Sequence, residues 1–224
     1  MLERAMIRAV LADDHPVFRH GVAGLLADTG EVEIVASVEN GTAAVQAAID
    51  HVPDIAILDL AMPEMNGVAV IRRLVERESP ARTIILSVYE SRVYVDQAFE
   101  AGASGYVLKR SAFTSIVQAV RAVHAGGTYT DPSLPARSIG PHRPVASPIH
   151  ESMHSPLTER EGDILRFVAF GFTSKEVAIR LGATPKAVEI QKARVCSRLG
   201  ITSRAQIVQF AILQGWLQGE IPVR

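Results

Sequence analysis

The sequence predicts an α/β domain built on a doubly wound parallel sheet, followed by a small all-helical domain. In the first half, short β-branched runs alternate with segments of helical periodicity, and the last third holds only short helical segments. Such alternation is typical of parallel strands joined by crossover helices. A proline-rich stretch separates the two halves, and 224 residues are enough for two domains.

Five strands are expected in the first half. Each run is short, apolar and rich in Val and Ile, as strands covered on both faces usually are. The runs are Ile7–Leu11, Ile34–Val38, Ile55–Leu58, Thr83–Leu86 and Tyr106–Leu108. Five helices alternate with them, over about 17–27, 42–50, 68–77, 92–101 and 113–124. Pro16 suits a first helical turn, and Gly102 suits the position just beyond a helix end.

The domain boundaries follow from composition. Residues 128–155 hold five prolines and no apolar periodicity, which is typical of an extended, semi-rigid spacer. We therefore expect a first domain over 1–127, a linker over 128–154 and a second domain over 155–224.

The second domain is predicted to contain four helices, with clear start and stop residues. Thr158 precedes Glu161 by three residues, which is the spacing of a capping box. Thr173 and Glu176 repeat that spacing. Only Gly182-Ala183-Thr184 separate the second helix from the third, as in a helix-turn-helix. The helices are expected over about 159–170, 174–181, 185–199 and 203–217.

Composition excludes several classes of protein. Hydrophobic residues make up 48% and charged residues 21%, as in soluble globular proteins. No apolar run reaches the roughly 18 residues that span a bilayer, and early acidic residues argue against a secretory signal. Cys196 is the only cysteine, so no intrachain disulfide or thiolate cluster can form. We expect a cytoplasmic protein that does not bind membranes.

Charge is divided unevenly along the chain. Residues 1–153 carry 13 Lys+Arg and 18 Asp+Glu, a net charge of −5, whereas residues 154–224 carry 10 and 6, a net charge of +4. An acidic first domain and a basic second domain indicate different partners for the two.

Polar side chains follow the predicted strands where each strand ends. They are Asp13 and Asp14, Asp59, Ser87 and Lys109. The carboxyl ends of parallel strands meet at one edge of the sheet, where open α/β sheets bind ligands. Three carboxylates gathered there repel one another, and a hard cation such as Mg²⁺ relieves that repulsion. With a lysine and a hydroxyl, the set indicates phosphoryl transfer, with an oxygen of Asp59 as the attacking atom.

Each of these residues also has an ordinary explanation when it is taken alone. Asp13 or Asp14 would cap the helix near Pro16, Ser87 would cap the helix that follows it, and Lys109 would be solvated. Their joint position at strand ends favours the shared site.

The first domain resembles the receiver domain of two-component response regulators over about residues 6–126. The resemblance rests on "LADDHP", "ILDLAMPEMNG", "ILSVYE" and "GYVLK". It implies a flavodoxin-like sheet with strand order 2-1-3-4-5 and phosphorylation of Asp59. It also implies that Asp14 and Asp59 ligate Mg²⁺ directly, that Asp13 assists through water and that Ala61 offers its backbone carbonyl. Ser87 and Lys109 match the positions that hold the phosphoryl group, and Tyr106 matches an aromatic switch.

Val88 departs from the resemblance. The family usually has alanine after the hydroxyl residue, so the bulkier Val88 is expected to slow phosphoryl entry or hydrolysis, or to weaken signalling.

The second domain resembles the LuxR-type output domain of the NarL/FixJ subfamily over residues 157–217. The resemblance rests on "LTERE", "GFTSKEVA" and "RLGITSR". The helix that starts at Pro185 is expected to enter the major groove of DNA. Glu189, Ile190 and Ala193 match base-facing positions, while the cations around them hold phosphates. The full set of expected DNA contacts is Lys175, Thr184, Lys186, Glu189, Ile190, Lys192, Ala193, Arg194 and Arg198.

The sequence thus predicts a transcription regulator and not an enzyme. A sensor histidine kinase is expected to phosphorylate Asp59, after which the protein dimerises on two half-sites of double-stranded DNA. Two alternatives stay open. One is a phosphatase of the haloacid-dehalogenase type, although Ala61 occupies the place of its second acid. The other is a DNA-binding protein whose receiver domain is structural or reads another ligand.

Overall fold

The protein was analysed as a computed structural model that describes residues 6–134 and 157–217. Its internal contacts divide the chain into two compact units, Met1–Gly140 and Pro141–Arg224. The border between them lies inside the predicted linker, whose residues 135–154 are outside the described ranges.

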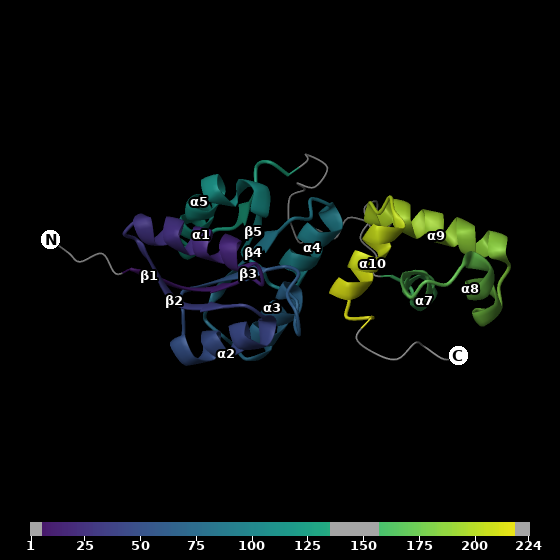
Figure 1. Cartoon of the computed structure of the whole chain (residues 1–224), viewed down its shortest axis with the longest axis horizontal. Helices are drawn as coiled ribbons and strands as arrows, with labels where there is room; N and C mark the ends of the chain where they lie inside the picture. Colours follow the sequence, from purple (N-terminus) through teal and green to yellow (C-terminus); the bar gives the residue numbers. More distant parts are fainter. Residues whose placement is uncertain (1–5, 135–156, 218–224) are drawn as a thin grey trace. The chain divides into compact units, whose positions relative to one another are not determined.

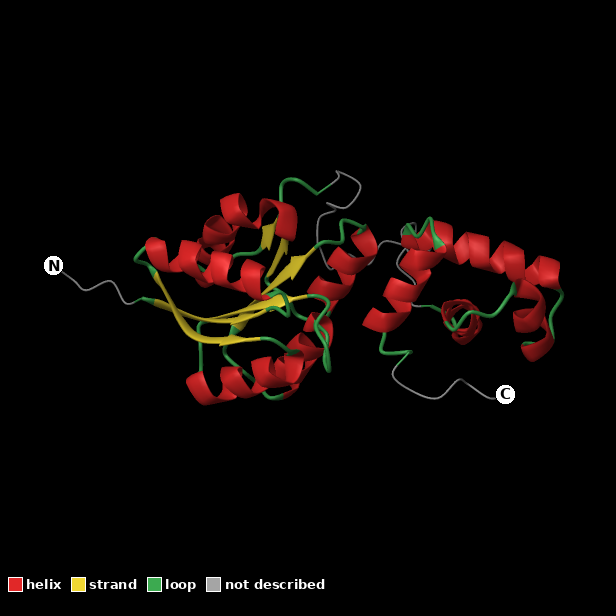
Figure 2. Cartoon of the chain, in the orientation of Figure 1, coloured by secondary structure: helices red, strands yellow, loops and turns green. Residues whose placement is uncertain are grey.

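The first unit is a parallel sheet with helices on both faces (Figures 1 and 2). Its strand order is β2-β1-β3-β4-β5-β6, so the five predicted strands and their order are confirmed. The strands are β1 (Ile7–Ala12), β2 (Val32–Val38), β3 (Ile55–Asp59), β4 (Arg82–Ser87), β5 (Gly105–Leu108) and β6 (Tyr129–Thr130).

Five α-helices connect the strands and cover both faces of the sheet. Figure 1 shows α1 and α5 on one face and α2 and α3 on the other. Every residue of β3 is buried, as expected for a strand enclosed by two helical layers. The helices are α1 (Pro16–Asp28), α2 (Gly41–His51), α3 (Gly67–Glu76), α4 (Arg92–Glu100) and α5 (Ala112–His124), with a 3₁₀ turn, η1 (Lys109–Ser111), before α5.

The sixth strand corrects the predicted start of the linker. β6 pairs with β5 through Gly105 and Tyr129 and through Tyr106 and Thr130, and Leu134 is buried. Residues 128–134 therefore belong to the first unit. A two-residue strand carries almost no periodic signal, and Pro132, two residues after it, favoured the interpretation of the segment as linker.

The described part of the second unit, residues 157–217, is all-helical, as predicted. Its helices are α7 (Glu159–Ala169), α8 (Ser174–Arg180), α9 (Pro185–Leu199) and α10 (Arg204–Leu213). Both predicted capping boxes are formed, at Thr158 and at Thr173. The last helix ends earlier than expected because Gly215 takes a left-handed backbone (φ 70°), which places Trp216 against Phe210.

A four-residue turn, residues 181–184, joins α8 to α9. Gly182 has φ 58°, and the Thr184 hydroxyl accepts a hydrogen bond from the Ala187 amide to cap α9. Among the described residues, none of the helices combines the length and the apolar character that crossing a bilayer requires.

Candidate functional site

The carboxyl edge of the sheet gathers the predicted acids around one lysine. Lys109 Nζ lies 2.7 Å from Asp13 Oδ2 and 2.8 Å from Asp59 Oδ2. The Asp13 side chain is fully buried, and the side chains of Asp59 and Lys109 are 4% and 10% exposed. Lys109 also lies over the ring of Phe18, 4.9 Å from its centroid. A solvated lysine, the ordinary explanation for Lys109, is thus not what the structure has.

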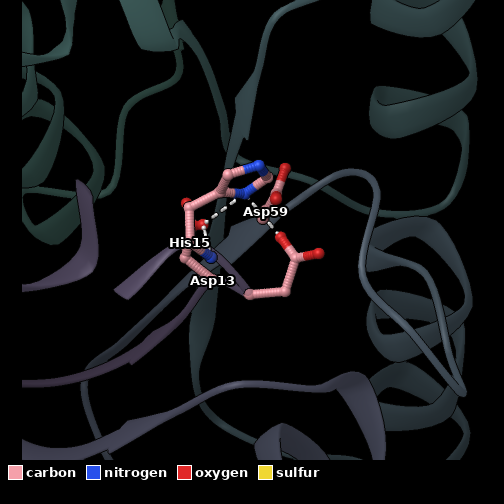
Figure 3. Close-up of side chains that lie close together, drawn as sticks. Asp13, His15 and Asp59 are labelled. Carbon is pink, nitrogen blue, oxygen red and sulfur yellow. Dashed lines mark hydrogen bonds and ion pairs between the residues drawn. The ribbon is translucent and has the colours of Figure 1, made fainter. Parts of the chain in front are cut away.

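Two neighbouring side chains complete the cluster. Asp14 Oδ1 lies 2.6 Å from His15 Nδ1, which is 3.3 Å from Asp13 Oδ1. One potential ligand atom from each of Asp13, Asp14, His15 and Asp59 lies within 4.8 Å of the others. Figure 3 shows Asp13, His15 and Asp59 of this group. Sequence reasoning gave His15 no role, and its only signal was its place directly after the two acids.

Burial dominates the electrostatics of Asp59. It raises the pKa of Asp59 to about 6, the nearby charge of Asp13 acts in the same direction, and the hydrogen bond and charge of Lys109 oppose it. The other carboxylate oxygen, Oδ1, accepts a hydrogen bond from the Ala61 amide at 3.2 Å. Asp59 is therefore an acid whose ionised form lacks some of the stabilisation that water would give.

The donor set fits a hard divalent cation. Within the described residues, Asp13 Oδ2 accepts no hydrogen bond, because Lys109 approaches it as an ion pair without hydrogen-bond geometry. Clustered carboxylate oxygens are the ligands that Mg²⁺ prefers, and a cation would add the positive charge that one lysine does not supply.

Ser87 comes from β4, which lies next to β3, and Tyr106 comes from β5, the next strand along the sheet. Ser87 is fully buried. It comes directly after Leu86, which pairs with Asp59 across β3 and β4, and Ser87 itself pairs with Leu108 in β5. Its Oγ accepts a hydrogen bond from the Tyr89 amide at 3.0 Å. Tyr106 is also fully buried, and its hydroxyl donates to the Tyr89 carbonyl oxygen at 2.8 Å. Burial raises the pKa of the Tyr106 phenol.

The capping roles considered for these residues are not formed. The residue before α1 is His15, which makes no side-chain cap, and α4 begins after Ser91 and not after Ser87. Val88, in contrast to its neighbour Ser87, is 65% exposed.

In the second unit, one face of α9 carries exposed side chains at helical spacing. Val188 and Val195 are buried, whereas Ile190 is 59% exposed although it is apolar. Lys175, at the start of α8, and Thr184 are exposed as well. The exposed face of α9 comprises Lys186, Glu189, Ile190, Ala193 and Arg194.

Three of the residues predicted to contact DNA are held by neighbours within this unit. Glu189 accepts a hydrogen bond from the Ser174 hydroxyl and pairs with Lys192 at 2.9 Å. Arg198 pairs with Glu161 of α7 at 2.7 Å, and its side chain is 19% exposed. Arg198 thus joins α9 to α7, away from the exposed face.

Comparison with known families assigns a domain to each unit. Residues 9–121 match the response regulator receiver domain. Residues 155–211 match the family of bacterial regulatory proteins of the luxR type.

Relatives match along almost the whole chain. A probable transcriptional regulatory protein NarL from Mycobacterium tuberculosis is 35% identical over 208 residues, which cover 93% of this chain and 94% of the relative. The oxygen regulatory protein NreC from Staphylococcus carnosus is 31% identical over 210 residues, with 92% and 97% covered.

Solved structures show the same folds. The receiver domain of a putative response regulator NarL from Mycobacterium tuberculosis is 39% identical and covers 54% of this chain and 98% of that one, with a TM-score of 0.53. RcsB from Salmonella enterica serovar Typhimurium, solved on promoter DNA with phosphomimetic BeF₃⁻, covers 94% and 100% with a TM-score of 0.78. At 23% identity, that second likeness concerns the fold alone.

Proposed function

The chain belongs to the response regulators that join a receiver domain to a LuxR-type regulatory domain, and we propose that phosphorylation of Asp59 controls its binding to DNA. The observation that carries the proposal is the pairing of Lys109 with both Asp13 and Asp59 at the carboxyl edge of the sheet.

The first domain would hold Mg²⁺ through Asp13, Asp14, Asp59 and the backbone carbonyl of Ala61. When bound, the ion would offset negative charge on the carboxylates and on an incoming phosphoryl group. The proximity of their oxygens and the raised pKa of Asp59 support this ligand set.

The chain's own residues position the reaction. A carboxylate oxygen of Asp59 attacks the phosphorus of a phosphohistidine on a sensor histidine kinase. The new P–O bond replaces the P–N bond, and the imidazole that leaves takes a proton from solvent. Lys109, which already lies 2.8 Å from Asp59 Oδ2, offsets the added charge, and the Ser87 hydroxyl offers a hydrogen bond.

Phosphorylation then alters the surroundings of the site. About two negative charges enter a pocket that is almost closed to solvent. Lys109 and Ser87 shift towards them, and Tyr106 follows because its hydroxyl is bonded to the loop after Ser87. The protein is proposed to dimerise in response, in the cytoplasm, and not to turn over a substrate as an enzyme does.

The second domain would place α9 in the major groove of double-stranded DNA. Its exposed face offers Glu189, Ile190 and Ala193 to base edges, with cations on the phosphates. The phosphate contacts we propose are Lys175, Thr184, Lys186, Lys192 and Arg194. For Glu189 to reach a base, it must release Ser174 or Lys192. Arg198 is left out because Glu161 holds it.

The phosphatase alternative has less support. Such an enzyme needs a second acid two residues after its nucleophile, and Ala61, which occupies that place, has no carboxyl side chain. Repeated hydrolysis of a phosphomonoester by the purified protein, lost in Asp59→Asn, would favour the enzyme.

The test is selection of DNA from random sequence with and without acetyl phosphate and Mg²⁺. We expect wild type to enrich paired half-sites strongly only with the donor, and Asp59→Asn to enrich them weakly in both conditions. Asp50→Asn, an exposed carboxylate on α2, is the matched control. Equal enrichment by all proteins in all conditions would support a structural receiver.

A further inference from the structure

A buried carboxylate lies behind the proposed site, in the segment that sequence reasoning placed in the linker. Asp131 is fully buried. Its Oδ2 accepts hydrogen bonds from the Leu108 amide at 3.0 Å and from the Ser111 hydroxyl. Its Oδ1 accepts from the Ser133 amide at 2.9 Å and the Ser133 hydroxyl at 2.6 Å. Both oxygens are thus fully engaged.

The side chain of Asp131 continues the hydrogen bonding between β5 and β6 beyond the last backbone hydrogen bond. Its amide donates to the Tyr106 carbonyl oxygen at 2.9 Å, which continues the pairing of β6 with β5. The next donor on β5 is the Leu108 amide, and it bonds to the Asp131 carboxylate. Pro132, which follows, has no amide hydrogen and cannot prolong a ladder.

The two groups that Asp131 holds on β5 and η1 lie on either side of Lys109. Leu108 precedes Lys109, and Ser111 comes two residues after it. The same oxygen therefore holds the Leu108 amide before the lysine and the Ser111 hydroxyl after it, and this lysine pairs with Asp13 and Asp59. Burial acts to raise the pKa of Asp131, but hydrogen bonds from Ser111, Ser133 and the backbone outweigh it, so the group stays ionised at neutral pH.

We propose that Asp131 is a positioning residue of the phosphoryl site, which sets the place of Lys109 and links its movement to the end of the receiver domain. This inference rests on the proposed function. Movement of Lys109 towards a phosphoryl group would pull on Leu108 and Ser111, and through them on Asp131. The Asp131 carbonyl oxygen also accepts from the amide of Leu134, the last described residue before the linker.

A double-mutant cycle separates positioning from general support of the fold. The rate at which acetyl phosphate labels Asp59 in the full chain is measured by mass spectrometry for wild type, Asp131→Asn, Lys109→Ala and the double variant. We expect Asp131→Asn to lower the rate about tenfold, because a misplaced group in such a site commonly costs one to two orders of magnitude. In the Lys109→Ala background the same change should alter the rate less than about twofold.

Two further variants make the result secure. Ser111→Ala removes one hydrogen bond to Asp131. It should lower the labelling rate less than Asp131→Asn does, with the same dependence on Lys109. This variant replaces Asp131→Asn in the cycle if Asp131→Asn does not fold. Asp50→Asn should label like wild type. Equal fold-losses with and without Lys109 would mean that Asp131 only supports the fold, and would overturn this inference alone. No labelling of wild type would instead overturn the proposed function, and this inference with it.

Discussion

Asp59 is an acid at the end of an apolar strand, and its neighbours explain how it is tolerated. Burial alone strongly disfavours an ionised carboxylate. Asp13 pairs with the same lysine as Asp59, so its negative charge lies close to that of Asp59 and repels it. Lys109 offsets part of this, which leaves the pKa of Asp59 at about 6. The excess negative charge around Asp59 would favour the binding of a cation. The proposed phosphorylation would then convert the carboxylate into an acyl phosphate.

Replacing Asp59 by Asn should stabilise the metal-free protein at neutral pH. The carboxyl of Asp59 has a pKa of about 6 in the folded protein and of 3.8 when it is unperturbed. The protonated carboxyl therefore contributes fully to stability below pH 3.8, and this contribution is lost as the pH rises through 6. Asn does not titrate. Chemical unfolding at pH 8 should show Asp59→Asn more stable by on the order of 2 kcal/mol, with the difference shrinking towards pH 4. A difference that is equal at both pH values would contradict the assigned pKa.

Strand ends were predictable from the sequence, but the neighbours that complete the site were not. Asp13, Asp59 and Lys109 meet because carboxyl ends of parallel strands share one edge, which depends only on element order. His15 and Asp131 depend on side-chain rotamers and on a two-residue strand, which leave no periodic pattern. Arg198, which the sequence predicted as a DNA contact, pairs with Glu161 of α7, and no local pattern reveals a partner 37 residues away.

Val88 gives a test of the departure from the family pattern. Val88 directly follows Ser87 in the chain and is 65% exposed. We expect Val88→Ala to raise the rate of labelling by acetyl phosphate severalfold, without changing Mg²⁺ affinity. An unchanged rate would show that Val88 does not restrict entry.

Arg194 and Arg198 should behave differently although both are arginines on α9. Arg194→Ala should weaken DNA binding similarly for all sequences and lower the salt slope by about one, as expected for a phosphate contact. Arg198→Ala should instead lower the free energy of unfolding by about 1–3 kcal/mol, because Glu161 loses its partly buried partner. A salt slope changed by Arg198→Ala, with stability unaffected, would place Arg198 on DNA after all.

Among the elements, α2 and the loop after β3 are in direct contact at one glycine. A Cβ on Gly41 would lie 1.9 Å from the Met65 carbonyl oxygen, in the loop that follows Asp59. The loop that carries Ala61 is therefore held in place by the start of a neighbouring helix. This contact joins elements that are far apart in sequence, so no local pattern reveals it.

Gly41→Ala should destabilise the protein by about 1–3 kcal/mol, as overpacking usually does. Gly24→Ala is the matched control, because nothing lies within 4 Å of a Cβ there and alanine favours the middle of helix α1. We expect the control to unfold at the same or a slightly higher denaturant concentration. Similar midpoints for both variants would mean that α2 and the loop separate easily.

On the scale of the whole molecule, the two domains differ in the charged side chains that they present, in line with their opposite net charges. The acidic half gathers carboxylates around one lysine, and the basic half exposes cations along one helix. The order of domains was read correctly from composition, while the end of the first domain was placed too early because β6 is short.

The most direct measurement of the central claim is the site of covalent labelling. The full chain is incubated with Mg²⁺ and acetyl phosphate, reduced with borohydride to trap acyl phosphates, and mapped by mass spectrometry. We predict one trapped group, on Asp59, which is absent without Mg²⁺ and absent in Asp59→Asn. Trapping at another residue, or no trapping in the wild type under these conditions, would contradict the account.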